Sequence, residues 1–267
     1  MNIPEEIRSL LPENCPLGRE IYYCEEIDST NRLAKQLAAD GAAHGTAVLA
    51  DRQHAGRGRL GKSFHSPSGG LYLSVIVRPS LQSSDMMAVT ACTASAVHMA
   101  LRDFGIQTQI KWVNDLFLND RKLCGILCEG GFHPQTGVLD YLIIGIGVNL
   151  RKTDDLPAEL VPIVTSIEEE TGKIIPRNAL SVLILCRLHE LLSELPQRTF
   201  LETYTQHSYT IGKRVVVSRT VSGNVSRETR EECGLAVGYS KDAGLIVRFD
   251  DGNEEIITSG TAVFAEQ

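Results

Sequence analysis

The chain has 267 residues, of which 43% are hydrophobic and 22% charged, so it is long enough for one large domain or a large domain followed by a small one. Its 26 basic and 33 acidic residues give a net charge of −7, which argues against a dedicated nucleic-acid-binding protein. The apolar runs fall far short of the roughly 20 residues of a membrane helix, and seven scattered cysteines favour free thiols in a reducing, cytoplasmic compartment.

Apolar spacing, turn residues and helix caps predict an α/β domain over residues 1–210, with a mixed sheet backed by helices. A short polar lead-in over 1–20 precedes it. In chain order, the patterns predict a strand at 21–24, a helix from within 28–31 to 41, strands at 45–50 and 71–78, a helix at 85–104, strands at 109–113, 116–118, 122–129 and 141–150, and helices at 166–172 and 178–195. The remaining stretch, 51–70, has no sustained periodicity, and a loop of that length is usually functional or disordered.

From about Ile211 onward, the sequence consists of short apolar runs and no longer shows helical patterns. Short strand-like runs at 213–219, 234–240, 244–249 and 254–260 are separated by turn residues. Several short strands in one tail predict a small closed β-barrel of SH3-like type over residues 211–267. The domain boundary is therefore expected near 206–212.

The loop after the second strand carries the first candidate chemistry. Arg52, Arg57, Arg59 and Lys62 stand among glycines in the segment DRQHAGRGRLGK. Glycines let backbone N–H groups wrap an anion, and guanidinium forks match phosphate or carboxylate oxygens in pairs. A solvated basic loop is the alternative, and nucleic-acid binding is a weaker one because the protein is acidic. The segment does not open a helix, so a dinucleotide-binding fold is not supported.

The segment KWVNDLFLNDRKLCGIL, residues 111–127, is the second candidate. It contains the only Trp of the chain beside Lys111, Asn114 and Asp115, and Lys122 begins an apolar strand. The Lys122 ammonium is therefore expected at the edge of a sheet that is otherwise buried. Alone, this segment would be interpreted as a hairpin with a solvated turn.

Together, these two segments resemble the biotin–protein ligase (biotin–[acetyl-CoA-carboxylase] ligase) family. The resemblance runs from DSTN at 28–31 through QHAGRGRLGKSFHSPSGGLYLS and KWVNDLFLNDRKLCGIL to IGIGVNL and on to the C-terminal barrel, in the right order. It implies a class II aminoacyl-tRNA synthetase-like catalytic domain followed by the SH3-like barrel. Family members that repress transcription carry a helix-turn-helix domain before the catalytic domain. The DSTN motif arrives too early for that, so a monofunctional ligase without DNA binding is expected.

The resemblance implies a two-step reaction that uses ATP and Mg²⁺. In the first step, the biotin carboxylate attacks the α-phosphate of ATP and displaces pyrophosphate, forming biotinyl-5'-AMP. In the second step, a specific lysine amine of a biotin carboxyl carrier protein attacks this mixed anhydride. Fixed cations placed where charge develops are the main means of catalysis. The resemblance therefore implies that Lys122, Arg59 and Arg57 are catalytic, with Asp115 near the metal and the attacking amine.

Carried over residue by residue, the resemblance places the biotin contacts at Ser29, Thr30, Asn31, Gln53, Gly56, Arg57, Gly58, Arg59, Lys122, Gly125 and Gly145. Within this set, Ser29 and Thr30 resemble contacts to the ring of biotin, and Gln53 a contact on its carboxylate side. Lys122 resembles the lysine that bridges the biotin carboxylate and the α-phosphate. Gly125 and Gly145 resemble pocket-lining positions where a side chain would fill the space that biotin needs.

The resemblance places the ATP contacts at Arg57, Arg59, Phe64, Lys111, Asn114, Lys122 and Asn149. The chain departs from the family pattern at two positions. Phe64 stands where the family usually has Trp, and a phenyl ring can still stack on adenine but lacks the indole N–H. Val113 stands where the family usually has Pro, which makes the turn before Asn114 and Asp115 less rigid.

Several other features have alternative explanations. Cys124 and Cys128 with His133 have the wrong spacing for a closed zinc site, so strand packing is expected and no metal ligand is assigned. His54 and His65 flank the basic loop, where surface histidines are common. The acidic run at 168–170 is interpreted as a solvated helix face. A lipoate- or octanoate-type acyl ligase on the same fold remains an alternative function, as does a non-catalytic nucleic-acid-binding module.

Overall fold

A computed structural model describes residues 2–78, 85–132, 139–222, 227–260 and 263–264. Its helices are α1 (Ile3–Leu10), α2 (Thr30–Ala39), α3 (Met86–Asp103), α4 (Ile167–Thr171), α5 (Arg177–Ser193) and α6 (Phe200–Gln206), with 3₁₀ turns η1 (Arg59–Gly61) and η3 (Leu195–Gln197). Its strands are β1 (Ile21–Ile27), β2 (Ala47–Gln53), β3 (Leu71–Val77), β4 (Gln109–Lys111), β5 (Asp115–Leu118), β6 (Arg121–Phe132), β7 (Leu139–Val148), β8 (Arg214–Ser222), β9 (Arg227–Tyr239), β10 (Leu245–Phe249), β11 (Glu254–Ile257) and β12 (Val263–Phe264).

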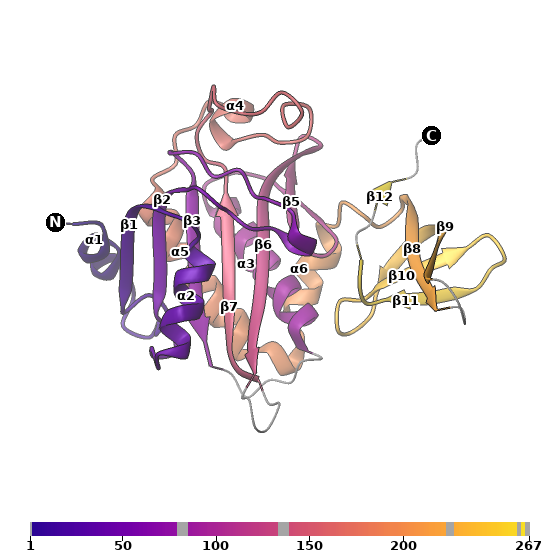
Figure 1. Ribbon diagram of the computed structural model, residues 1–267, viewed down its shortest axis with the longest axis horizontal. Coiled ribbons are helices and arrows are strands. Elements are labelled where there is room, and N and C mark those ends of the chain that lie inside the picture. Colours follow the sequence, from indigo (N-terminus) through magenta and orange to yellow (C-terminus); the bar gives the residue numbers. More distant parts are fainter. Residues whose placement is uncertain (1, 79–84, 133–138, 223–226, 261–262, 265–267) are drawn as a thin grey trace.

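A seven-stranded mixed sheet organises the larger part of the chain (Figure 1). Its strand order is β1-β2-β3-β7-β6-β5-β4, and β1 and β2 pair in parallel while the other neighbours pair antiparallel. Helices α3, α5 and α6 cover one face of this sheet, and α2 crosses the other. The α/β class with a mixed sheet, expected from the sequence, is confirmed.

The buried residues of the sheet explain why its two faces differ. Successive side chains of a strand point to opposite faces, so Ile144 of β7 joins the large core beneath α3 and α5, while Ile143 packs beneath α2. Helix α3 is buried on nearly all sides and is built mostly of small residues, which lets it lie close to both the sheet and α5. The small α2 cluster covers only part of its face, and the rest is available for a site.

Most predicted elements lie where the sequence indicates, with ends shifted by a few residues. The lead-in is an exception, because residues 3–10 form α1 and bury Ile7 against the core. Its start carries a complete capping box, in which the Asn2 side chain accepts from the Glu5 backbone and the Glu5 side chain accepts from the Asn2 backbone. That pair is a sequence signal for α1 that the polar composition of the segment obscured.

The C-terminal strands form a separate five-stranded antiparallel sheet in the order β11-β10-β9-β8-β12. It contacts the larger part through the turn between β9 and β10. There the Trp112 indole N–H donates to the Ala243 carbonyl at 2.8 Å, and Arg198 pairs with both Asp242, at 2.8 Å, and Asp85, at 3.0 Å. The predicted small β-unit is present, and its division from the larger part as a domain over 211–267 remains a prediction.

None of the helices in the described ranges is both long and apolar enough to cross a membrane. Of the seven cysteines, all are free thiols. Cys124 and Cys128 lie in β6 and pack into the core, as predicted, whereas His133 lies outside the described residues.

Burial of His98 predicts that stability falls in mild acid. Burial, followed by the nearby charges of His207 and Arg102, lowers the pKa of His98 from 6.5 to about 4, although its Nδ1 contacts the Thr108 hydroxyl at 2.9 Å. Between these pH values the unfolded chain binds the proton more readily, so the free energy of unfolding decreases as the pH falls. The shift corresponds to about 3 kcal/mol.

Urea unfolding of the wild type and of His98→Asn at pH 7 and pH 4 measures this effect. The wild type should lose about 3 kcal/mol more than the variant over that interval. Equal losses would show that His98 does not stay neutral in the folded protein.

Candidate functional site

Glycines leave a hollow on the sheet face that α2 only partly covers. Gly125 of β6 is paired with Gly147 of β7, and Gly145 lies two residues earlier on the same face. A Cβ atom at Gly145 would stand 2.0 Å from Asn31 Oδ1, and one at Gly147 would stand 2.5 Å from the Phe64 ring. The glycine pattern of IGIGV therefore provides the floor of a cavity.

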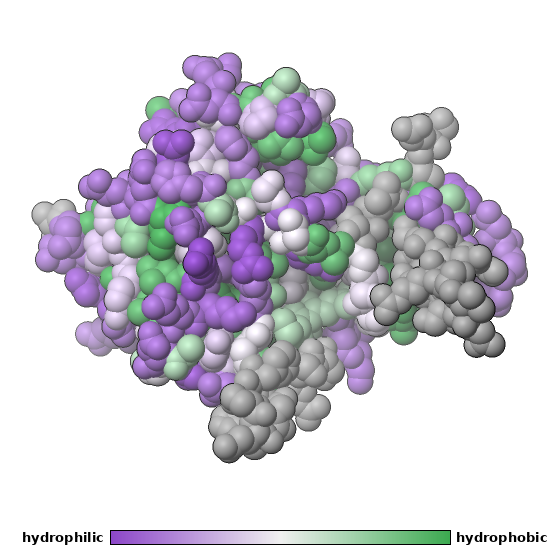
Figure 2. All heavy atoms as spheres, in the orientation of Figure 1, coloured by the Kyte–Doolittle hydropathy of each residue, from purple (hydrophilic) through white to green (hydrophobic). Residues whose placement is uncertain are grey.

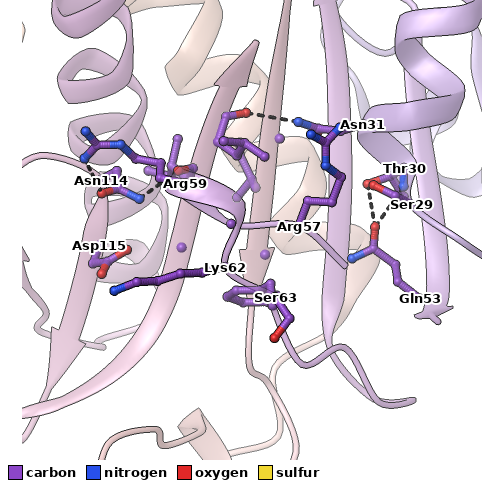
Figure 3. A pocket seen from close by; sticks show the side chains of 18 of the residues that line it. Ser29, Thr30, Asn31, Gln53, Arg57, Arg59, Lys62, Ser63, Asn114 and Asp115 are labelled. Atoms are coloured by element: carbon purple, nitrogen blue, oxygen red, sulfur yellow. Dashed lines mark hydrogen bonds between the residues drawn. The ribbon is translucent and has the colours of Figure 1, made fainter. Parts of the chain in front are cut away.

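This first cavity has a volume of about 160 Å³ (Figure 3). It is lined by Ser29, Thr30, Asn31, Gln53, Arg57, Gly58, Arg59, Leu60, Lys62, Ser63, Phe64, Asn114, Asp115, Lys122, Gly125, Ile126, Leu127, Gly145, Ile146 and Gly147. The structure thus brings together almost every residue that the sequence singled out. In the space-filling view of this face, hydrophilic residues gather over the middle of the larger sheet (Figure 2).

One end of the cavity is a hydrogen-bonded network at the start of α2. Gln53 Oε1 accepts from the Thr30 backbone N–H at 2.8 Å and from its hydroxyl at 3.1 Å. Ser74 Oγ lies 2.8 Å from Thr30 Oγ1 and 2.7 Å from Asn31 Oδ1, within hydrogen-bond distance of both. Gln53 is therefore fixed beside Thr30 at this end, and its expected contact with the carboxylate side of biotin stays a prediction.

Glu129 extends this network and was not singled out by the sequence. Its carboxylate accepts from Asn31 Nδ2 at 2.9 Å and pairs with Arg57 Nη1 at 3.2 Å. The sequence gives little sign that Glu129 belongs to the site, because it ends a mostly apolar run and its partners Asn31 and Arg57 are distant in sequence. The contact ties the basic loop to the start of α2.

The basic loop has more structure than its sequence indicates. It folds back on itself through the backbone bonds Gly58 N to Lys62 O, at 2.7 Å, and Phe64 N to Gly56 O, at 2.8 Å. A Cβ atom at Gly56 would stand 2.3 Å from the Phe64 carbonyl oxygen, so only glycine fits there. Gly56 therefore shapes the loop and does not itself line the cavity.

Arg59 crosses from the loop to two other parts of the chain. It donates to Asn114 Oδ1 at 3.1 Å and to the Gly260 carbonyl, in the C-terminal part, at 3.2 Å. Asn114 in turn donates to the Ile126 carbonyl at 2.9 Å. It follows the Trp112–Val113 peptide, which is cis. The guanidinium is thus held at the cavity wall by groups from two other segments of the chain.

Lys122 lies on the same wall and pairs with Asp115. Its Nζ is 2.7 Å from Asp115 Oδ1 and 5.8 Å from the centroid of the Phe64 ring. The side chain is 25% exposed, so the ammonium is reachable from the cavity but largely removed from bulk water. Lys122 is the second residue of β6, so it lies at the strand end, as expected, on a strand that is interior to the sheet between β7 and β5.

Lys111 is the predicted ATP contact that lines neither this cavity nor the next. Its Nζ lies 5.3 Å from the Phe117 ring centroid and 4.7 Å from that of Phe264. Burial, together with the charges of Lys122 and other nearby lysines, lowers the pKa of Lys111, and Asp115 partly opposes the shift. Lys111 is therefore outside both cavities but close enough to Asp115 and Lys122 for their charges to shift its pKa.

A second cavity of about 300 Å³ adjoins the first. Its lining includes Tyr72, Leu156, Leu160, Ile163 and Val164, with polar groups supplied by His65, Asn149, Arg151, Thr165, Ser166 and Glu169. Lys62, Ser63, Phe64 and Lys122 line both cavities. The Phe64 ring therefore lies at the junction, and Lys122 reaches both spaces.

His54 and His65 differ in their surroundings. His54 pairs with Glu26 at 3.0 Å on the surface, away from both cavities. His65 lines the second cavity, and its Nε2 is buried without a hydrogen-bond partner in the described structure. His65 is therefore a candidate ligand contact that the sequence could not distinguish from a surface histidine.

No three His, Cys, Asp or Glu side chains come together as a metal site within the residues that the structure describes. Mg²⁺ usually keeps several waters and relies on one or two carboxylates plus substrate phosphates. Asp115 is the carboxylate that lines the first cavity, and it is paired with Lys122. The donor set therefore fits a magnesium ion bound to phosphates and not one held by the protein alone.

Comparison with known proteins gives a consistent result. Residues 23–149 match the Biotin/lipoate A/B protein ligase family. The bifunctional ligase/repressor BirA of Bacillus spizizenii is 32% identical over 252 residues, which are 91% of this chain and 74% of that protein. The biotin–[acetyl-CoA-carboxylase] ligase of Paracoccus denitrificans is 30% identical over 86% of this chain and 94% of its own length.

A solved structure adds to these sequence relatives. The biotin protein ligase of Aquifex aeolicus, in complex with biotin and ATP, superposes with a TM-score of 0.73 at 27% identity. The alignment covers 93% of this chain and 100% of that one. The likeness therefore extends over nearly the whole chain.

Proposed function

Because the chain belongs to the biotin/lipoate A/B protein ligase family, we propose that it is an ATP-dependent biotin–protein ligase. It activates biotin as biotinyl-5'-AMP and transfers the biotinyl group to a lysine of a biotin carboxyl carrier protein. The biotin–[acetyl-CoA-carboxylase] ligase of Paracoccus denitrificans and the Aquifex aeolicus ligase bound to biotin and ATP support this assignment.

The observation that carries the proposal is the position of Lys122 at the junction of two cavities. The first is narrow and polar at its far end, and the second is larger and mostly apolar. A carboxylate reaching out of the first would meet a phosphate reaching out of the second beside the Lys122 ammonium. Two anions repel each other, so a fixed cation between them lowers the cost of their approach.

We assign the first cavity to biotin. Ser29, Thr30 and Asn31 supply hydroxyl and amide groups at the far end, where a ureido ring can exchange hydrogen bonds. Gln53 belongs with this end because it holds Thr30. The glycine floor at Gly125, Gly145 and Gly147 leaves room for the bicyclic ring and the acyl chain.

We assign the second cavity to the adenosine part of ATP. The Phe64 and Tyr72 rings and aliphatic side chains offer surfaces for a flat base. Asn149 is placed to read the base, because its Nδ2 donates to the Thr165 carbonyl at 3.0 Å and its carbonyl oxygen can face a ligand amine. The phosphates then point toward Lys122 and the basic loop.

The first chemical step forms a bond between a biotin carboxylate oxygen and the α-phosphorus and breaks the bond to pyrophosphate. Arg57, Arg59 and Lys122 face the cavity where negative charge gathers, whereas the Gly58 N–H already donates to the Lys62 carbonyl. Charge stabilisation of this kind is commonly worth about 3 kcal/mol for one donor. In the second step, an uncharged lysine amine attacks the carbonyl carbon, the C–N bond forms as the C–O bond to AMP breaks, and the nitrogen gives up one proton to solvent. Asp115 lines the cavity that this amine approaches.

A magnesium ion bound to ATP would supply further charge neutralisation of the phosphates. The chain's own contribution is to orient the two substrates and to exclude water, because a mixed anhydride hydrolyses when water reaches it. We also propose that the basic loop closes over biotin and ATP when they bind. We place the enzyme in the cytoplasm, where seven free thiols stay reduced.

Biotin-dependent ATP–pyrophosphate exchange tests the function. The purified protein should incorporate labelled pyrophosphate into ATP only when biotin is present. Biotin should also raise the melting temperature more than lipoate or octanoate at equal concentration, because the glycine floor and the Ser29–Asn31 end match a ureido ring. Exchange driven by lipoate but not biotin would assign the acyl-ligase alternative.

A nucleic-acid-binding module is the alternative from another class. It predicts binding that weakens steeply with salt, whereas the net charge of −7 predicts little binding at physiological salt. Fluorescence anisotropy with a labelled DNA duplex between about 50 and 200 mM salt distinguishes a nucleic-acid-binding module from the proposed ligase. The absence of DNA binding is thus a prediction.

A further inference from the structure

A segment that we call the strap, residues 160–166, runs across the start of β6 and forms one wall of the second cavity. Leu160, Ile163, Val164, Thr165 and Ser166 of the strap all line that cavity. The backbone of Lys122 bonds to it on both sides, since Lys122 N donates to Ile163 O at 2.8 Å and Thr165 N donates to Lys122 O at 2.9 Å. The position of the strap is therefore coupled to the position of Lys122.

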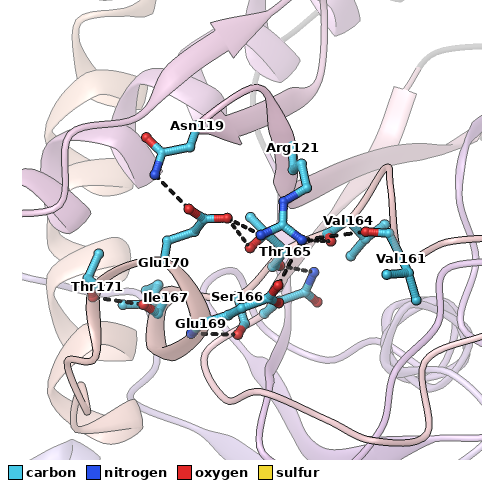
Figure 4. A network of polar contacts seen from close by, with 11 residues as sticks. Asn119, Arg121, Val161, Val164, Thr165, Ser166, Ile167, Glu169, Glu170 and Thr171 are labelled. Carbon is cyan, nitrogen blue, oxygen red and sulfur yellow. Dashed lines mark hydrogen bonds and ion pairs between the residues drawn. The ribbon is translucent and has the colours of Figure 1, made fainter.

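Arg121, the residue before Lys122, fastens the strap (Figure 4). Its guanidinium donates to Glu169 Oε1 at 2.8 Å, to Glu170 Oε1, and to the Val164 carbonyl at 3.4 Å. The expectation that residues 168–170 form a solvated helix face holds for the exposed Glu169 but is wrong for Glu170, whose side chain is only 10% exposed. A single guanidinium thus joins β6, the strap and α4.

The Glu170 carboxylate accepts hydrogen bonds from the side chains of Thr165 and Asn119 as well as from Arg121. Thr165 Oγ1 donates to its Oε1 at 2.7 Å and Asn119 Nδ2 donates to its Oε2 at 2.6 Å. Burial alone would raise the pKa of Glu170, but these hydrogen bonds and the Arg121 charge lower it. The carboxylate therefore stays ionised and remains a firm anchor for Arg121.

The charge balance of this cluster also matters for a polyanionic ligand. Glu169 lines the second cavity, and Glu170 lies directly behind it. Without Arg121, two carboxylates would stand unopposed beside a space assigned to ATP, and like charges at such distances repel. Arg121 therefore has two effects: it holds the strap in place as the cavity wall, and it neutralises the carboxylates of Glu169 and Glu170.

We propose that Arg121 is a positioning residue for ATP: it fixes the strap as the wall of the nucleotide cavity and neutralises Glu169 and Glu170. The proposal rests on the assignment of ATP to the second cavity. Arg121 acts through the strap and does not contact the reacting atoms. Its loss should therefore weaken ATP binding and leave the biotin end of the first cavity unchanged.

The test compares Arg121→Gln with the matched control Arg187→Gln. Arg187, on α5, also pairs with two carboxylates, Asp103 at 3.1 Å and Glu190 at 3.0 Å, but lines neither cavity. Exchange assays should give a KM for ATP about tenfold higher in Arg121→Gln, with the Kd for biotin unchanged by calorimetry. Arg187→Gln should leave both values at the wild-type level.

Arg121→Lys should recover part of the loss, because a lysine keeps the charge but not the bidentate fork. If Arg121→Gln does not fold, Arg121→Lys and Glu170→Gln give the same comparison, with circular dichroism and thermal melting as folding checks. An unchanged KM for ATP, or an equal rise in the Arg187 variant, overturns the proposal. A wild-type protein with no biotin-dependent exchange would instead refute the proposed function.

Discussion

Replacing Lys122 by alanine should lower biotin-dependent ATP–pyrophosphate exchange by about 10²- to 10³-fold, as removal of one fixed donor to a developing charge usually does. Lys122 reaches both cavities, and its ammonium lies 2.7 Å from Asp115. The loss should fall mainly on kcat, because the carboxylate and the phosphate most need this cation when the bond between them forms. Steady-state kinetics of ATP–pyrophosphate exchange, with the wild type and the Lys122→Ala variant, measure this loss in kcat.

The matched control is Lys173→Ala. Lys173 is also a lysine with a hydrogen-bonded ammonium, which donates to the Phe104 carbonyl at 3.2 Å, but it lines neither cavity. Lys122→Met, which keeps most of the apolar stem, separates the charge from the packing. Wild-type exchange in a folded Lys122→Met variant would remove Lys122 from the mechanism.

Replacing Gly145 by alanine should raise the Kd for biotin by at least tenfold, or about 1.4 kcal/mol. The new Cβ would stand 2.0 Å from Asn31 Oδ1. Asn31 cannot swing away freely, because it accepts from Ser74 at 2.7 Å and donates to Glu129 at 2.9 Å. Overpacking of this kind also costs about 1–3 kcal/mol of stability. Calorimetry with biotin and urea unfolding measure the two effects.

Gly238→Ala provides the comparison for this variant. Gly238 is also a strand glycine, in β9, but a Cβ atom there would meet only Ile246 Cδ1, at 3.9 Å. Biotin affinity should therefore remain at the wild-type value. If Gly145→Ala binds biotin as tightly as Gly238→Ala does, the glycine floor is not part of the biotin site.

The fold was largely predictable because its elements have local signals. The runs that became β3 and β7 are mostly apolar, and such runs between turn residues indicate buried strands. Helix α1 was missed because its burial depends on one residue, Ile7, in an otherwise polar segment. Strand β12 is only two residues long and exists through its pairing with β8, which no local pattern reports.

The site was predictable where it consists of contiguous motifs and not where it depends on distant pairs. The glycine–arginine loop and the residues around Lys122 do meet at one cavity. Glu129 and Arg121 were missed because their partners lie far along the chain: Asn31 is 98 residues from Glu129, and Glu170 is 49 residues from Arg121. Charge runs in a sequence do not reveal which of their members are paired.

The bond from Arg59 to the Gly260 carbonyl has a practical consequence for anyone who wants a smaller enzyme. Cutting the chain before β8 would also strip the Trp112 indole of its acceptor on Ala243 and Arg198 of its partner Asp242. The trimmed protein would expose the Trp112 side chain. It would also free Arg59, which lines the first cavity, from one of its two hydrogen-bond partners. The residues from β8 onward thus support the wall of the first cavity that Arg59 forms, and a shortened version has to keep them.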